Sequence, residues 1–404
     1  MELVARLAEF AGEDAARLWV VGGCVRDRLL GRSFHDVDVV VSGAVVFARS
    51  FARAARAAFV LLDDGRGTAR VVDRADRDLY LDLCEPQGDL DTDLRRRDFT
   101  VNAIACRLTD WCAGVPAWHD PTGGLADLAA RRLRVVSEQS LCADPLRVLR
   151  AHRLAAVLGF ACDPLTVALL RAAAPRLSEM AAERVHQEWW ALLAAPAAPA
   201  EVERMVESGA LAALLPRLDG GATARLRRLD AVAAALDGCP DWVRWCESGG
   251  GWPVARFAAL LGRARGGCNE RELTRRFALS RGERHRLGAL GQAVPPEGTS
   301  AARVATLVLA ATGDAPGALA VSAACGELTR HELGALAAEL PAVMARWREA
   351  PLVDGKDLQG ELGHAPGPKF RTALGRVRDG QLSGELTTRA AALAVAREVL
   401  ESDG

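Results

Sequence analysis

The sequence predicts an α+β protein, with a small mixed β-sheet within residues 1–130 and a long all-helical part after it. Short β-prone runs separated by glycine turns occur only in this first part. After about residue 125 the chain is rich in Ala, Leu and Arg, which favour helices. A chain of 404 residues exceeds the size at which one hydrophobic core stops growing, so several domains are expected.

The composition is that of a globular protein, with 50% hydrophobic and 25% charged residues. The formal net charge is −1, so a nucleic acid would have to meet a local basic surface. The 10 cysteines form no C-x-x-C pair, and neither a signal-peptide pattern nor a membrane-spanning apolar run is visible. Reduced thiols and a cytoplasmic location are therefore expected, with no membrane or protein partner.

The chain is organised around residues 19–43. After an amphipathic helix predicted over residues 1–18, Trp19–Val21 reads as a short strand, Gly22-Gly23 as a tight turn and residues 25–30 as a helix. Backbone N–H groups at a glycine turn that opens a helix suit a phosphate group, and Arg26 adds a cation.

A second strand is predicted over residues 36–41. Because residues two apart on a strand share a face, Asp36 and Asp38 project together beside the glycine turn. Two carboxylates next to a triphosphate would hold Mg²⁺, which prefers oxygen ligands and substrate phosphates. A glycine turn or a D-x-D pair alone more often has only a structural role. The two together, in this order and on adjacent elements, are a more specific sign of a nucleotide site.

The run GGCVRDRLLG followed by D-x-D resembles motif A of the nucleotidyltransferase superfamily that includes DNA polymerase beta. Within it, the pattern is similar to the class II tRNA nucleotidyltransferase and bacterial poly(A) polymerase family. The resemblance implies a polymerase-beta-like head, Mg²⁺ as cofactor, and transfer of nucleotides from CTP and ATP to the 3′ end of tRNA. It also implies a third carboxylate on a later strand.

The best candidate for that third carboxylate is Asp82. A helix is predicted over residues 44–58, and strands over 59–62, 69–72 and 78–83. Asp82 would face the first two carboxylates if its strand neighbours theirs, and a solvated strand aspartate is the alternative.

Residues 94–103 (LRRRDFTVNA) resemble motif B of the same family. Three arginines in a row are often only a solvated charge run. By the resemblance, Arg97 contacts the triphosphate and Asp98 accepts a hydrogen bond from the ribose 2′-hydroxyl, a task that suits a carboxylate because it donates none. Asn102 supports the same site.

Residues 119–128 (HDPTGGLADL) resemble motif C, a flexible joint between head and neck, with Asp127 starting a helix. A plain loop is the alternative, and both interpretations put a domain boundary here.

From Cys142 a continuous helix is predicted, with four candidate nucleotide-binding residues winding around one side: Asp144, Arg147, Arg150 and Arg153. The run ADPLRVLRAHR resembles motif D, E-D-x-x-R, in which the Asp and Arg act as a protein template for the incoming base. Asp144 would accept from the exocyclic amine shared by C and A, and Arg147 would donate to a ring acceptor. Ala143 replaces the usual Glu, which puts the placement of the helix in doubt.

Residues 182–189 resemble motif E, for which structural stabilisation is expected. Later residues match the family less well. Many relatives carry a further domain with a metal-binding His-Asp pair, but both His-Asp pairs of this sequence lie inside other motifs, so no second hydrolase centre is inferred. Six arginines on a helix-turn-helix-like stretch are either a solvated face or contacts to tRNA phosphates: Arg271, Arg275, Arg276, Arg281, Arg284 and Arg286. The predicted parts are a catalytic head (1–130), a neck that recognises the base (131–195), a body (196–350) and a tail that contacts the tRNA elbow (351–404).

The predicted function is template-independent addition of CCA, or part of it, to the 3′ end of tRNA by two-metal nucleotidyl transfer. Relatives that add all of CCA carry a long flexible loop between the third-carboxylate strand and motif B, implicated in the switch from C to A. Here only residues 84–94 separate Leu83 from Arg95, which points towards an enzyme that adds only CC or only the terminal A. A poly(A) polymerase and an RNA-binding protein with an inactive head are the alternatives.

Overall fold

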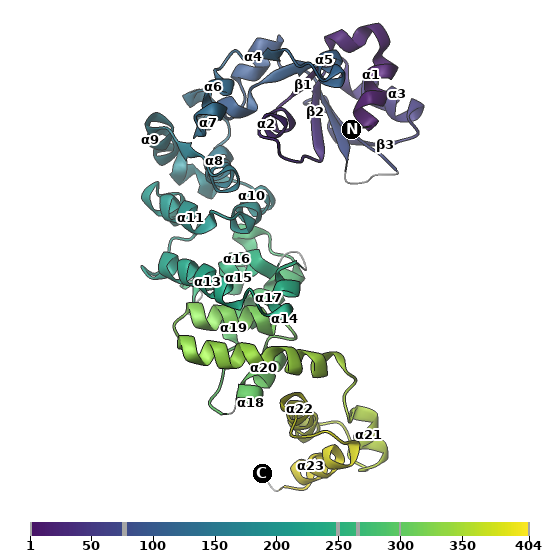
Figure 1. Cartoon of the computed structure of the whole chain (residues 1–404), viewed down its shortest axis with the longest axis vertical. Coiled ribbons are helices and arrows are strands. Elements are labelled where there is room, and N and C mark those ends of the chain that lie inside the picture. The colour runs from purple at the N-terminus through teal and green to yellow at the C-terminus, as the bar shows by residue number, and fades with distance from the viewer. Residues whose placement is uncertain (1, 75–78, 248–250, 264–266, 299, 403–404) are drawn as a thin grey trace. The chain divides into compact units, whose positions relative to one another are not determined.

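The structure is a computed structural model that describes residues 2–74, 79–247, 251–263, 267–298 and 300–402 (Figure 1). The chain divides into two compact units. The first comprises Met1–Met180 with Glu207–Ala210, and the second comprises Ala181–Val206 with Leu211–Gly404. The predicted division into head, neck, body and tail is finer than this and stays a prediction.

The first unit contains a seven-stranded mixed sheet in the order β3-β4-β5-β2-β1-β6-β7. Only β2 and β5 pair in parallel, and every other pair in this sheet is antiparallel. The predicted α+β class is therefore confirmed. The strands are β1 (Trp19–Val21), β2 (Asp36–Val40), β3 (Ala58–Asp63), β4 (Thr68–Val72), β5 (Tyr80–Cys84), β6 (Ala105–Arg107) and β7 (Trp118–His119).

Short helices surround this sheet, and α3 packs against β3, β4 and β5. The N-terminal helix ends earlier than predicted, because Gly12 adopts a φ of +55° and the chain continues as a 3₁₀ turn, η1 (Gly12–Arg17). The other elements are α1 (Glu2–Ala11), α2 (Gly23–Leu29), α3 (Ala44–Ala54), α4 (Leu90–Arg95), η2 (Thr100–Asn102), α5 (Leu108–Ala113) and α6 (Gly124–Ala129). Of the strand predicted over 78–83, Asp78 lies outside the described residues.

The continuous helix predicted from Cys142 is wrong, because the chain breaks at Asp144. Asp144 has an extended backbone (φ −146°, ψ 92°), since a residue that precedes proline is disfavoured in the helical region. The elements here are β8 (Arg132–Leu133), α7 (Glu138–Ala143), α8 (Leu146–Leu158), β9 (Ala161–Cys162), α9 (Pro164–Ala173) and η3 (Ala174–Glu179). Because β8 and β9 pair in parallel as a second, two-stranded sheet, the prediction of helices alone after residue 130 is wrong for this segment.

The described residues of the second unit fold into helices alone. These are α10 (Ala182–Ala194), α11 (Ala198–Glu207), α12 (Ala210–Leu214), α13 (Ala222–Leu236), α14 (Pro240–Glu247), α15 (Gly251–Leu261), α16 (Glu270–Phe277), α17 (Arg281–Gln292), α18 (Ser300–Ala310), α19 (Ala315–Ala324), α20 (Arg330–Arg348), α21 (Gly355–Gly360), α22 (Pro368–Ser383) and α23 (Arg389–Glu401).

Two hydrophobic clusters organise the second unit. The larger is built from residues of α15, α18, α19 and α20, and every residue of α19 is buried. The smaller joins Val353, Leu358 and Phe370 to α23, so the last fifty residues have a core of their own. Among the described residues no single helix is long and apolar enough to span a membrane. The pair α18 and α19 meets that criterion only jointly, across a bend of 107°.

Candidate active site

The turn between β1 and α2 brings three of the predicted site residues together. Gly22 adopts φ +84° and ψ −141°, a conformation that residues with a side chain rarely take. A Cβ atom at Gly22 would lie 2.8 Å from Oδ2 of Asp38 and 3.1 Å from Nη1 of Arg97. Glycine is therefore required here both for its backbone and for the close approach of a carboxylate and a guanidinium group. Gly23 is the first residue of α2.

The predicted carboxylates lie on neighbouring strands. In the parallel pair of β2 and β5, Asp38 stands opposite Asp82 and Asp36 stands opposite Tyr80. The strand of Asp82 therefore neighbours the strand of Asp36 and Asp38, as the role predicted for Asp82 requires. Asp36 is exposed and Asp38 is half-buried.

Arg70, which sequence reasoning missed, holds Asp82 in place. Its Nε and Nη2 atoms donate to the two carboxylate oxygens of Asp82 at 2.7 and 2.8 Å, and its guanidinium carbon lies 3.8 Å from the ring centroid of Tyr80. Arg70 and Asp82 are register partners on the antiparallel strands β4 and β5. Once that pairing is known, a cross-strand ion pair is the expected signal.

The electrostatics at Asp38 fit a divalent cation. Burial, together with the negative charges of Asp82 and Asp36, raises the pKa of Asp38 to about 6, against the opposing effect of Arg97. A bound cation would offset this accumulation of negative charge. Within the described ranges no three acidic, histidine or cysteine side chains form a ready-made metal cage. An open pair of carboxylates completed by substrate phosphates is the arrangement that Mg²⁺ favours.

A chain of hydrogen bonds connects α2 to motif B and to α8. Arg26 donates to both carboxylate oxygens of Asp27 at 3.0 and 2.7 Å, and to Oδ1 of Asn102 at 2.7 Å. Asn102 donates to Asp98 at 3.1 Å, and Asp98 also accepts from Nη1 of Arg150 at 3.3 Å. All of these residues except Asp27 were predicted separately to bind nucleotide, and the structure brings them together into one network.

Asp98 is buried but remains ionised. Burial by itself would raise the pKa of Asp98, but Arg150, the Asn102 amide and the N–H of Phe99 together outweigh it and hold that pKa below its usual value. Asp98 therefore presents an acceptor and no donor.

The two residues of the predicted base template lie at the break between α7 and α8. The carboxylate of Asp144 accepts from the N–H of Leu146 at 3.3 Å. Nη1 of Arg147 donates to the carbonyl oxygens of Arg96, Arg97 and Ser140 at 3.1–3.4 Å. Arg153 lies on α8, three residues beyond the Arg150 that bonds Asp98.

A pocket of about 380 Å³ joins these parts in the first unit. Its lining includes Arg97 from motif B, Asp144 and Arg147 from the template, and Cys84 at the end of β5. Ala143, which replaces the usual Glu, lines the same pocket, so this substitution borders the site.

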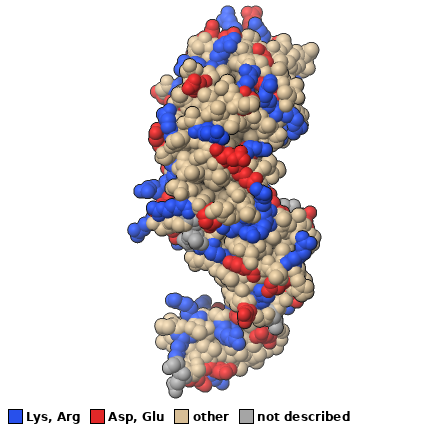
Figure 2. Space-filling view, turned by 90° about the vertical axis from the view of Figure 1, so that its left-hand side faces the viewer, with Lys and Arg blue, Asp and Glu red and all other residues tan. Residues whose placement is uncertain are grey.

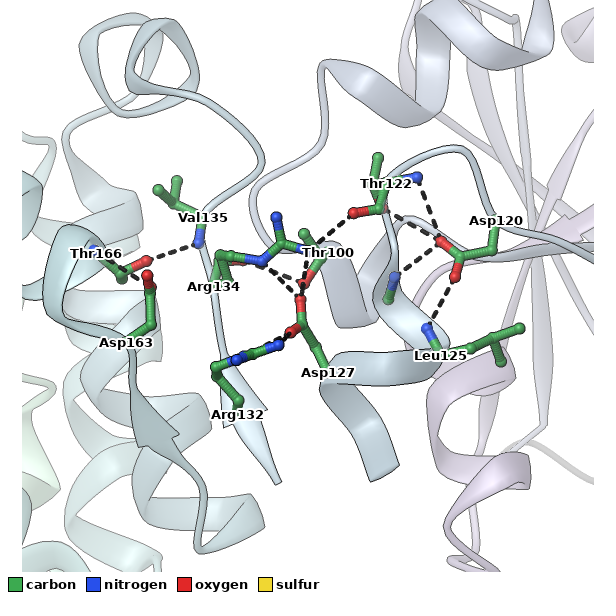
Figure 3. Close-up of polar contacts among 11 residues, drawn as sticks. Thr100, Asp120, Thr122, Leu125, Asp127, Arg132, Arg134, Val135, Asp163 and Thr166 are labelled. Atoms are coloured by element: carbon green, nitrogen blue, oxygen red, sulfur yellow. Dashed lines mark hydrogen bonds and ion pairs between the residues drawn. The ribbon is translucent and has the colours of Figure 1, made fainter. Parts of the chain in front are cut away.

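Motif C is tied down by hydrogen bonds (Figure 3). Asp120 accepts from the N–H groups of Gly124 and Leu125 at 2.8 and 2.9 Å, so α6 begins at Gly124 and the predicted start at Asp127 is wrong. A Cβ atom at Gly124 would lie 2.1 Å from the carbonyl oxygen of Thr100. This contact presses the segment against motif B.

Asp127 lies inside α6 and is fully buried. It accepts from the hydroxyl of Thr100 at 2.7 Å and from Nε of Arg132 and Arg134 at 2.7 and 2.8 Å, as Figure 3 shows. The segment predicted to be a joint is therefore bonded both to motif B, through Thr100, and to the residues that follow it, through Arg132 and Arg134.

The arginine cluster of the second unit contains residues of two kinds. Arg286 donates to Asp314 at 2.7 and 2.9 Å and so stabilises the fold. Arg271, Arg275 and Arg281 are exposed on α16 and α17. Burial lowers the pKa of Arg276.

On α10, Glu188 is buried, in line with the structural role expected for motif E.

Two family models match segments of the chain between residues 18 and 220. Residues 18–134 match the poly A polymerase head domain, and residues 159–220 match the probable RNA and SrmB-binding site of polymerase A. The CC-adding tRNA nucleotidyltransferase of Geobacter sulfurreducens is 33% identical over 416 residues, which cover 96% of this chain and 93% of that enzyme. The A-adding tRNA nucleotidyltransferase of Deinococcus radiodurans is 39% identical over 207 residues, covering 50% of this chain and 46% of the relative.

The fold is also that of a solved enzyme. The Thermotoga maritima CCA-adding enzyme complexed with tRNA has a TM-score of 0.70 and 22% identity, with 99% of this chain and 94% of the other covered. Carboxylates on adjacent strands beside a glycine turn, in a head of this type, define a nucleotidyltransferase. The chain belongs to the family of CCA-adding tRNA nucleotidyltransferases and bacterial poly(A) polymerases, as its motifs predicted.

Proposed function

We propose that this enzyme adds the two cytidines of the CCA sequence to the 3′ end of tRNA, from CTP and with release of pyrophosphate. The observation that carries the proposal is similarity over nearly the whole chain to a CC-adding enzyme. The relative that adds only A matches about half of the chain.

The connection between β5 and α4 supports addition of only part of the CCA sequence, either CC or the terminal A. β5 ends at Cys84 and α4 begins at Leu90. Glu85 donates its N–H to the carbonyl oxygen of Gly67 at 3.0 Å, and its carboxylate accepts from the N–H of Ala44 at 3.0 Å. A connection this short and anchored leaves no long loop to rearrange between C and A addition.

In the reaction we propose, the 3′-hydroxyl of the tRNA attacks the α-phosphorus of CTP, a new P–O bond forms and pyrophosphate leaves. Asp36 and Asp38 would hold Mg²⁺, and Asp82, kept in place by Arg70, completes the acidic group. The bound metal supplies a lowered pKa for the attacking hydroxyl and charge neutralisation for the leaving group. Arg97 presents Nη1 to the phosphates beside Gly22 and Gly23, while Arg26 holds Asn102 for Asp98.

The sugar and the base are read by separate groups. The ionised Asp98 accepts from the ribose 2′-hydroxyl, and Arg150 and Asn102 orient it. Asp144 accepts from the exocyclic amine of cytosine, and Arg147 donates to a ring acceptor. Uracil and guanine lack this pairing and would leave buried polar groups unsatisfied.

The test is incubation with tRNA that lacks CCA, ends in C or ends in CC, each with one labelled nucleotide. We expect two C residues on the first, one on the second and none on the third, with no A. Addition of A only to tRNA ending in CC would identify an A-adding enzyme. A long A tail would identify a poly(A) polymerase, and no incorporation would indicate an inactive head.

Acidic and basic side chains are interspersed on the face shown in Figure 2, so this face is not uniformly basic. Contacts to tRNA phosphates therefore need local groups of basic side chains. We propose that arginines of α16 and α17 contact tRNA phosphates and that residues 351–404 contact the elbow. Replacing Arg275, Arg276 and Arg284 by Ala should weaken binding and reduce the log–log salt slope by about one unit per lost contact. Arg17→Ala, at an 84% exposed position, is the control. An unchanged slope would return the cluster to the solvated-face interpretation.

The remaining expectation concerns the compartment. None of the ten cysteines, all of which lie in the described residues, forms a disulfide. A cytoplasmic location stays a prediction, which fractionation of the source cells would test.

A further inference from the structure

Arg97 is held from one side by a carboxylate outside the recognised motifs. Oδ2 of Asp93 accepts from Nε and Nη2 of Arg97 at 3.3 and 3.2 Å. The two residues are four apart at the end of α4, and the side chain of Asp93 is 12% exposed. Because Nε and Nη2 form one edge of the planar guanidinium group, Nη1 faces away from Asp93.

Nη1 of Arg97 points to the glycine turn, where a phosphate group would bind. Nη1 lies at the glycine turn, 3.1 Å from where a Cβ of Gly22 would be, and Oδ2 of Asp38 lies 2.8 Å from that same point. Arg97 is therefore drawn towards two carboxylates, Asp93 and Asp38. If Asp93 lost its charge, Asp38 would compete for the guanidinium group that a phosphate requires.

Asp93 also connects Arg97 to the short segment that follows β5. Its second oxygen, Oδ1, accepts from the N–H of Gln87 at 3.3 Å. Gln87, Asp93 and Arg97 all line the pocket of about 380 Å³. The Asp93 carboxylate thus links the short connection after β5 to Arg97 at the glycine turn.

We propose that Asp93 is a positioning residue that holds Arg97 so that Nη1 is presented to the triphosphate of the incoming nucleotide. The proposal rests on the proposed function, in which Arg97 binds phosphate. A long arginine side chain loses rotamer freedom when it binds a ligand, and a partner that orients it beforehand reduces that cost. The expected consequence is a loss of affinity confined to ligands that carry the pyrophosphate group.

The test is calorimetric binding of CTP, CMP and inorganic pyrophosphate at fixed Mg²⁺, without tRNA. Asp93→Asn should weaken CTP and pyrophosphate roughly tenfold, corresponding to about 1.4 kcal/mol, and leave CMP unchanged. Asp93→Glu, which keeps the charge, should restore most of the CTP affinity. The matched control is Asp91→Asn, on the same helix, where the side chain is 48% exposed and contacts His119.

A double variant tests whether Asp93 acts through Arg97. Asp93→Asn combined with Arg97→Ala should bind CTP no more weakly than Arg97→Ala alone. Equal weakening of CTP and CMP by Asp93→Asn would mean a general structural role and would overturn the proposal, as would unchanged CTP affinity. If Arg97→Ala itself leaves the CTP-to-CMP ratio unchanged, the failure lies in the phosphate role given to Arg97 in the proposed function.

Discussion

Replacing Gly22 with alanine tests the geometry of the site most directly. The backbone at Gly22 (φ +84°, ψ −141°) would cost a residue with a side chain about 1–3 kcal/mol of folding free energy. In addition, the new Cβ would lie 2.8 Å from Oδ2 of Asp38. Cβ atoms in proteins essentially never approach another atom more closely than 3.0 Å, so the carboxylate must move. Since a misplacement of about 1 Å costs about 100-fold in rate, a shift of several tenths of an ångström should cost roughly tenfold or more.

The control for this variant is Gly31→Ala. Gly31 also has a positive φ, +65°, but a Cβ atom added there would meet no atom within 4 Å. It should lose about 1–2 kcal/mol of stability and keep its catalytic rate. The assay is single-turnover incorporation of CMP onto tRNA lacking CCA, with thermal unfolding measured on the same samples. If Gly22→Ala incorporates CMP as fast as Gly31→Ala, the close approach of Asp38 to the turn does not matter for catalysis.

Four further predictions concern the carboxylates and the template. Asp36→Ala or Asp38→Ala should abolish nucleotide addition and the stabilisation by Mg²⁺ with the fold intact; wild-type-like turnover would remove the metal assignment. Because the pKa of Asp38 is raised to about 6, ionisation of this carboxyl costs folding free energy. Without metal, the wild type should therefore lose stability relative to Asp38→Asn as the pH rises from about 4 through about 6, and parallel unfolding curves would contradict this. Asp98→Ala should lose discrimination between CTP and dCTP, and an unchanged ratio would mean that another group reads the sugar. Arg147→Ala should narrow the preference for C over U and G by roughly tenfold or more, whereas uniform slowing of all four nucleotides would refute the template.

The sequence alone determined those features that depend on local periodicity. Asp36 and Asp38 share a face because side chains alternate along any strand, whatever packs beside it. The strand, glycine turn and helix at residues 19–29 follow from an apolar run and two glycines. The break at Asp144 was also readable, because Pro145 disfavours a helical residue before it. Motif similarity outweighed that local signal in the prediction of a continuous helix.

The tertiary structure decided which distant residues meet. On the side away from β1, β2 pairs with β5 rather than with β3, and this pairing sets Asp82 opposite Asp38. The partners of the arginines were equally out of reach of the sequence. Arg70 holds Asp82, and Arg26 holds Asn102. Long side chains can reach many acids, so the choice among them depends on strand register and burial, which only the packed chain determines.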